Sequence, residues 1–168
     1  MQRTDLRLLF SYHYWATKRI LEAAERISPE QFTRPGDYGE GSVRSILVHA
    51  LSSERNWRTR WQGGEIYGNL DQQAFPDVET LQAFWQQQER EMRTFLDGCD
   101  EESFTQIFTG RTSGGIPFTD PIWHSMMQVL FHGAQHRSEV AELLTVYGSS
   151  PGDLDFFIFL RHRQHVLE

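Results

Sequence analysis

Apolar residues recur every three or four positions along most of the chain, and this spacing is typical of amphipathic helices. The pattern stops and restarts several times, because stretches rich in Gly, Pro and polar residues interrupt it. It therefore predicts four long helices, which span residues 5–26, 42–62, 77–98 and 121–147.

Residues with known preferences for helix ends support these boundaries. Ser42 and Asp77 can cap the second and third helices, since their side-chain oxygens accept hydrogen bonds from the first backbone N–H groups. Asp120-Pro121 predicts the start of the fourth helix, with Asp120 as the cap and Pro121 at the first helical position. Gly148 is the expected end of that helix.

The segment 103–119 has a different pattern. "FTQIFTG" alternates between apolar and polar residues, and "GIPFT" follows after the turn-rich "RTSGG", which predicts a short β-hairpin. "SPEQF" predicts a single capped turn, and "FFIFLRHR" a short terminal helix. We find no repeat or linker, so residues 1–168 are expected to form one domain. The predicted fold is an all-α four-helix bundle with a short β-hairpin insertion before the last long helix.

Composition and charge exclude several classes of function. The formal net charge is −7 and the chain has no basic block, which argues against a nucleic-acid partner. No apolar run is long enough for a membrane span, and the N-terminus lacks the features of a secretory signal. The single cysteine, Cys99, is expected to be structural, and its solitary presence favours a reducing, cytoplasmic location.

Two histidines in the fourth helix suggest a metal site. His132 and His136 lie one turn apart, so both rings can reach one ion, whereas His124 is rotated roughly 80° from that face. His49 lies on or beside the apolar stripe of the second helix and is the best third ligand. A lone histidine there would more often be an ordinary core residue. Three unpartnered imidazoles in a core would, however, cost about 1–3 kcal/mol each, a large part of a typical stability of about 5–15 kcal/mol. The set His49, His132 and His136 therefore favours a metal site.

These residues also match the motifs of a known family. The chain contains "S-x-x-x-I-L-x-H" ending at His49, "H-x-x-x-H-R" from His132 to Arg137, and "G-x-x-P-G-D-L-D" from Gly148 to Asp155. In these motifs, and over nearly its whole length, the chain resembles the DinB/YfiT-like metalloenzymes. The resemblance implies an up-down-down-up bundle in which three histidines bind a divalent metal, often nickel or zinc. It also implies a homodimer, because members of the family are frequently dimeric. Candidate contacts are Trp57, Trp61 and the run 156–160.

Three histidine ligands leave a coordination position open, which is the arrangement of catalytic sites. Imidazole also suits iron and other metals, so the sequence does not identify the ion. The resemblance favours a small-molecule substrate, in particular a low-molecular-weight thiol, because some family members transfer such thiols. A metal-dependent hydrolase and a non-catalytic, metal-stabilised stress-response or interaction module stay open as alternatives.

Several neighbouring residues are weaker candidates for a role near the metal. Glu139 and Gln128 can assist as acid or base, but contacts behind the ligands or at the surface are the more common roles. Tyr12, His13 and Trp15 on the first helix can border the pocket, although core packing is the ordinary explanation for each.

Overall fold

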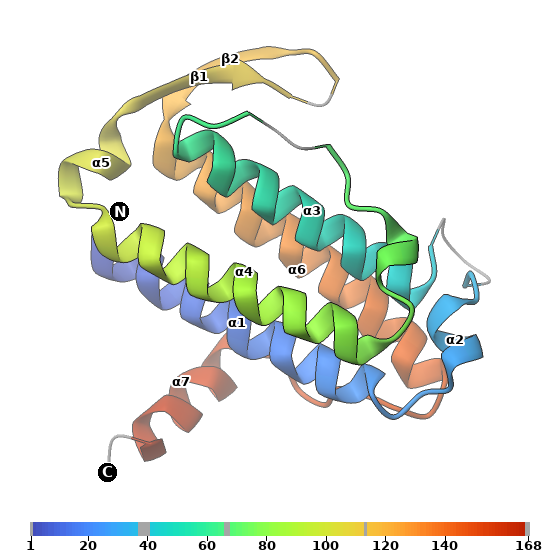
Figure 1. The fold of residues 1–168 in the computed structure, drawn as a ribbon. Coiled ribbons are helices and arrows are strands. Elements are labelled where there is room, and N and C mark those ends of the chain that lie inside the picture. Colours follow the sequence, from blue (N-terminus) through green and yellow to red (C-terminus); the bar gives the residue numbers. More distant parts are fainter. Residues whose placement is uncertain (1, 37–40, 66–67, 113, 167–168) are drawn as a thin grey trace.

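Four long helices form the body of the protein in the computed structural model, which describes residues 2–36, 41–65, 68–112 and 114–166. They are α1 (Arg3–Ala24), α3 (Val43–Trp61), α4 (Val78–Gly98) and α6 (Ile122–Val146). α1 and α6 run in one direction and α3 and α4 in the other, which is the expected up-down-down-up order (Figure 1). α6 packs against α3 and α1, and α4 packs against the same two helices from the other side.

Shorter elements connect the helices. They are α2 (Pro29–Thr33), the 3₁₀ turn η1 (Gln72–Ala74), α5 (Glu101–Thr105), β1 (Ile107–Arg111), β2 (Pro117–Pro121) and α7 (Phe156–Val166). The hairpin of β1 and β2 precedes α6, as the sequence predicted, whereas α5 was not anticipated. In Figure 1 the hairpin extends over the C-terminal end of α3 and the start of α6.

Most of the predicted helix ends are confirmed. The Ser42 hydroxyl accepts a hydrogen bond from the Ser45 N–H, and Asp77 accepts one from the Thr80 N–H. Gly148 has a φ of +77°, the left-handed conformation that lets the chain turn away after α6. Each of these local preferences is independent of the tertiary structure.

The predicted cap of α6 is wrong. Asp120 lies in β2 opposite Phe108, and the cap position is taken by Pro121, with no side-chain hydrogen bond. The reason is that strand pairing continues to the start of the helix: Ile107 is opposite Pro121, and the Ile122 N–H donates to the Gln106 carbonyl. The Asp120 carboxylate instead contacts His124, at 3.2 Å.

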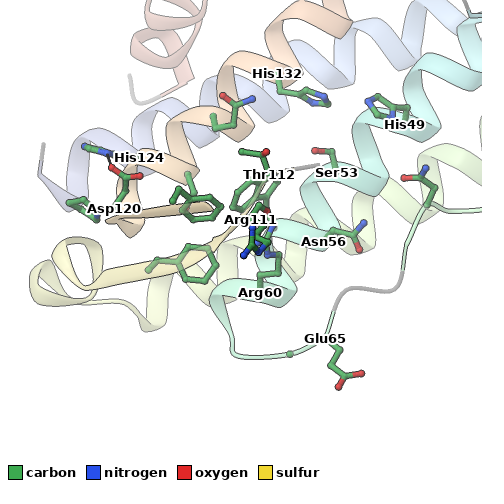
Figure 2. Close-up of a pocket in the computed structure, with 18 residues that line it drawn as sticks. His49, Ser53, Asn56, Arg60, Glu65, Arg111, Thr112, Asp120, His124 and His132 are labelled. Atoms are coloured by element: carbon green, nitrogen blue, oxygen red, sulfur yellow. Dashed lines mark hydrogen bonds and ion pairs between the residues drawn. The ribbon is translucent and has the colours of Figure 1, made fainter. Parts of the chain in front are cut away.

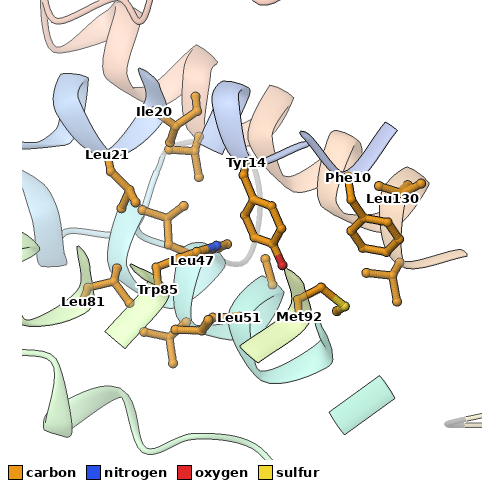
Figure 3. Packing of buried hydrophobic residues seen from close by; sticks show 14 of the residues in the cluster. Phe10, Tyr14, Ile20, Leu21, Leu47, Leu51, Leu81, Trp85, Met92 and Leu130 are labelled. Carbon is orange, nitrogen blue, oxygen red and sulfur yellow. The ribbon is translucent and has the colours of Figure 1, made fainter. Parts of the chain in front are cut away.

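The apolar core fills the space between the four long helices (Figure 3). Leu51 on α3 is fully buried, and Trp85 and Met92 on α4 face it from the opposite helix. Phe10 and Tyr14 extend the core along α1. This burial fixes which face of α3 points inward and therefore which face is left for a site.

The C-terminal helix packs on the outside of the bundle. Phe159 is buried against Tyr12 and Trp15 of α1, whereas Phe157 is 71% exposed. Trp61 is buried and donates a hydrogen bond to the Ser125 hydroxyl, so it is not available as the surface contact that the sequence suggested. The homodimer itself stays a prediction. No helix in the described part of the chain is long and apolar enough to cross a membrane.

We predict that Leu51→Ala lowers the free energy of unfolding by about 2–5 kcal/mol, because it leaves a cavity between α3 and α4. Phe157→Ala, which removes a larger but exposed side chain, should change it by less than about 0.5 kcal/mol. Urea denaturation followed by circular dichroism measures both. Equal losses for the two variants would contradict this placement of the core.

Candidate metal centre

Three histidines from two helices meet on one side of the bundle. His49 is on α3, and His132 and His136 are one turn apart on α6. One ring nitrogen of each lies within 4.8 Å of the others, and the Nε2 atoms of His132 and His136 are 3.1 Å apart. Two nitrogens at about 2.0–2.1 Å from one tetrahedral ion would stand roughly 3.3 Å apart. The predicted set is therefore brought together at a spacing that fits a shared divalent ion.

The protonation of the cluster also fits metal binding. The Nδ1–H of His136 donates to the Glu139 carboxylate at 2.7 Å, which leaves its Nε2 lone pair directed at His132. Partial burial and the neighbouring His136 and His49 lower the pKa of His132 to about 4, and burial and His136 lower that of His49. Neutral imidazoles are the form that coordinates a metal.

The cluster differs from the expectation in its burial. We expected the three rings to converge in the bundle core, but His49 is exposed and the other two are half-buried. The core face of α3 is filled by Leu47 and Leu51, so His49 points to the side of that stripe. The rings therefore line the boundary between core and solvent, where a small molecule can reach them.

A buried hydrogen-bond network lies behind the cluster. Arg137, which follows His136, donates to His13 Nδ1 at 2.7 Å. The opposite ring nitrogen of His13 is 2.9 Å from the Glu54 carboxylate, which also accepts from the Tyr14 hydroxyl. Burial and the Arg137 charge lower the pKa of His13 despite the opposing effect of Glu54, so the ring is neutral and its Nε2–H donates. The network thus links α6, α1 and α3, and its hydrogen bonds are donated in one direction, from Arg137 to His13 and from His13 to Glu54.

Gly133 makes this network possible. A Cβ atom at this position would lie 2.6 Å from His13 Cε1 and 3.0 Å from His13 Nδ1. Only glycine lets the His13 ring approach α6 closely enough to contact Arg137. The same turn of α6 carries the ligand His132, so the network and the cluster share their backbone.

Two clefts reach the three histidines from opposite directions along α3 and α6. The larger, of about 1140 Å³, extends from His49 and His132 toward the hairpin (Figure 2). The second, of about 690 Å³, extends from His49 and His136 toward the other end of the two helices, past Glu139 and Glu142. His49 lines both, so the cluster is accessible from two sides.

The other residues considered in the sequence analysis differ in where the structure places them. Gln128 lines the larger cleft, and Glu139 contacts a ligand from behind, one of the roles considered for it. Tyr12 and Trp15 do not border the clefts but pack against α7. Cys99 is half-buried, and burial raises its pKa, so it is not an activated thiol.

Glu54 was missed at the sequence level. It is buried on the inner face of α3, in line with Leu47, Leu51 and Trp61. A charged residue within an apolar stripe is a detectable signal, because such a group is stable there only with partners. Its partner His13 was named, but only as a residue that can border the pocket.

We predict that Glu139→Ala weakens metal binding about 10–100-fold, because His136 loses the acceptor that orients its ring. Glu142→Ala removes the same charge one turn further along α6 without touching a ligand, and it is the matched control. Competition with a chromophoric chelator measures both affinities. Equal affinities for the two variants would exclude an orienting role for Glu139.

Gly133→Ala should destabilise the protein by about 1–3 kcal/mol, because the new methyl group collides with His13. This sign is opposite to the usual gain of about 0.5–1 kcal/mol when alanine replaces a helical glycine. Gly98→Ala, where the added Cβ meets nothing within 4 Å, is the control and should not destabilise. A Gly133→Ala variant more stable than the parent in urea would contradict the observed packing.

A comparison with known proteins identifies the family of the chain. A model of the DinB family matches residues 1–165, and no curated protein matches the chain. The match includes α3 and α6 with all three histidines, and it confirms the resemblance predicted from the motifs. The chain therefore belongs to the DinB family.

Proposed function

We propose that the protein is a divalent-metal-dependent enzyme that transfers a low-molecular-weight thiol to an acceptor molecule. The observation that carries this proposal is the position of the three-histidine cluster at the junction of two clefts. A transferase has to bring two molecules to one reactive centre. One cleft can admit the thiol and the other the acceptor.

His49, His132 and His136 would hold the ion, and nickel and zinc are the first candidates, with iron or another divalent metal as alternatives. A divalent ion bound there supplies positive charge that favours the ionised form of a thiol near neutral pH. Because all three ligands are neutral, they leave that charge uncompensated. The ligand set therefore favours an anionic nucleophile.

The proposed reaction requires few groups from the protein. The thiol loses its proton to solvent, its sulfur forms a bond to an electrophilic carbon of the acceptor, and the leaving group departs with its bonding electrons. The chain positions both reactants and orients the ligands. Glu139 contributes by holding His136, and its hydrogen bonds from His136 and Gln135 outweigh partial burial and lower its pKa.

A hydrolase is the closest alternative and requires a base to activate water. Among the described residues, Glu139 is the carboxylate that contacts a ligand, but its hydrogen bond from His136 and its lowered pKa make it a poor base. A purely structural ion is the third alternative. It has less support, because structural sites are closed whereas this cluster opens into two clefts.

We expect the cobalt-substituted protein to develop intense near-ultraviolet absorption when small thiols are added, because sulfur ligation produces charge-transfer bands. His132→Ala should abolish these bands, and His124→Ala, which removes an imidazole from the same cleft, should retain them. Chelation should abolish thiol transfer while the helical circular dichroism persists.

Two outcomes would overturn the proposal. If no thiol perturbs the cobalt spectrum while ester or amide substrates are hydrolysed, the protein is a hydrolase. If neither class reacts and metal removal only lowers the melting temperature, the ion stabilises the fold.

A further inference from the structure

We propose that the end of the larger cleft nearest the hairpin is a carboxylate-binding subsite formed by Arg60 and Arg111. The substrate that enters this cleft would then be an elongated small molecule with a metal-reactive group at one end and a carboxylate at the other. This inference rests on the proposed function, because it specifies what one of the two clefts accepts.

The polar residues of α3 mark the path between the two ends. His49, Ser53, Asn56 and Arg60 all line the cleft, and their spacing of three or four residues places them along one helical face (Figure 2). From His49 to Arg60 the helix axis advances roughly 16 Å at about 1.5 Å per residue. The Arg60 side chain leans back toward the helix N-terminus, which shortens the distance that a ligand has to span.

The Arg60 guanidinium is held in place by aromatic rings rather than by an acid. It lies 4.6 Å from the ring centre of Trp57 and 5.7 Å from those of Phe108 and Phe118. Gly110 leaves the room for it, since a Cβ there would lie 2.5 Å from Arg60 Nη2. These contacts orient the Arg60 guanidinium before any ligand binds.

Both guanidinium groups keep most of their hydrogen-bonding capacity. Within the described residues, Arg60 donates to the Arg111 carbonyl at 3.2 Å, and Arg111 donates to the Gly115 carbonyl at 2.8 Å. Neither forms an ion pair with a carboxylate in that part of the chain. Each guanidinium has five N–H donors, and a carboxylate can accept two from one fork.

Two acidic residues also line this cleft, but they do not pair with the two arginines. Asp120 contacts His124 at 3.2 Å, and Glu65 lies apart from the two arginines in Figure 2. The chain has a net charge of −7, so two neighbouring arginines form a local region of positive charge. The Arg60 guanidinium donates to the main-chain carbonyl of Arg111, which keeps the two residues close. The same Arg60 that attaches the hairpin to α3 is therefore available to select an anionic substrate.

Sebacic acid monohydroxamate and its methyl ester test this inference. The hydroxamate group binds divalent metals whether or not the enzyme uses thiols. The two probes differ at the far end alone, where the methyl group of the ester removes the negative charge. Binding to the zinc-loaded protein is measured by isothermal titration calorimetry. We expect the acid to bind at least about tenfold more tightly than the ester, as one charge-assisted hydrogen-bonded contact allows, and this preference should fall with added salt.

Arg60→Gln and Arg111→Gln should each lower the ratio of acid affinity to ester affinity. Arg60→Lys, which keeps the charge, should retain part of the preference for the acid. Arg90→Gln on the exposed face of α4 makes the same charge change outside the cleft and should have no effect. Melting temperatures establish that each variant is folded.

The two probes separate the possible failures. The subsite is excluded, while the metal centre stands, if the ester binds and the acid binds no more tightly than the ester. The same holds if the higher affinity of the acid persists in both glutamine variants. If neither probe binds the zinc-loaded protein, the metal centre fails and the subsite inference fails with it.

Discussion

The buried network of Arg137, His13, Glu54 and Tyr14 is the constraint on which the metal centre depends. His13 and Glu54 are each 2% exposed, so each charged or polar atom needs its partner. The donors point one way, from Arg137 through the neutral His13 ring to Glu54. Leaving a buried polar group without its hydrogen-bond partner typically costs about 1–3 kcal/mol, and more when that group is charged. The network therefore fixes the rotation and height of α6 and α3, and with them the ligands that these helices carry.

Much of the fold follows from local patterns in the sequence. The four helices, the Ser42 and Asp77 caps and the hairpin were predictable, because helical periodicity and end preferences act over a few residues. The role of Asp120 was not, because strand pairing extends to Pro121, directly before α6, and keeps Asp120 within β2. Hydrogen bonds between residues distant in the sequence decide such cases, and a local pattern does not contain them.

The three candidate ligands could be predicted from the sequence, whereas their burial and the groups and clefts around them could not. Spacing on α6 and one histidine on α3 were enough to identify the cluster. The exposure of His49, the charge network and the two clefts depend on how α1 and the hairpin pack against these helices. Arg60 acquires its position only when Phe108 and Phe118 from the hairpin surround it. The hairpin, which extends over the C-terminal end of α3 and the start of α6, thus shapes the larger cleft beside the histidines.

X-ray absorption spectroscopy of the zinc-loaded protein tests the central claim most directly, because it reports the ligands of the ion without a substrate or an assay. The account predicts three imidazole nitrogens at about 2.0–2.1 Å, with the remaining position filled by a light atom from solvent. Loss of one imidazole from the spectrum should follow each single alanine replacement of His49, His132 and His136. A parent spectrum with fewer than three imidazoles, or one dominated by carboxylate oxygens, would contradict it.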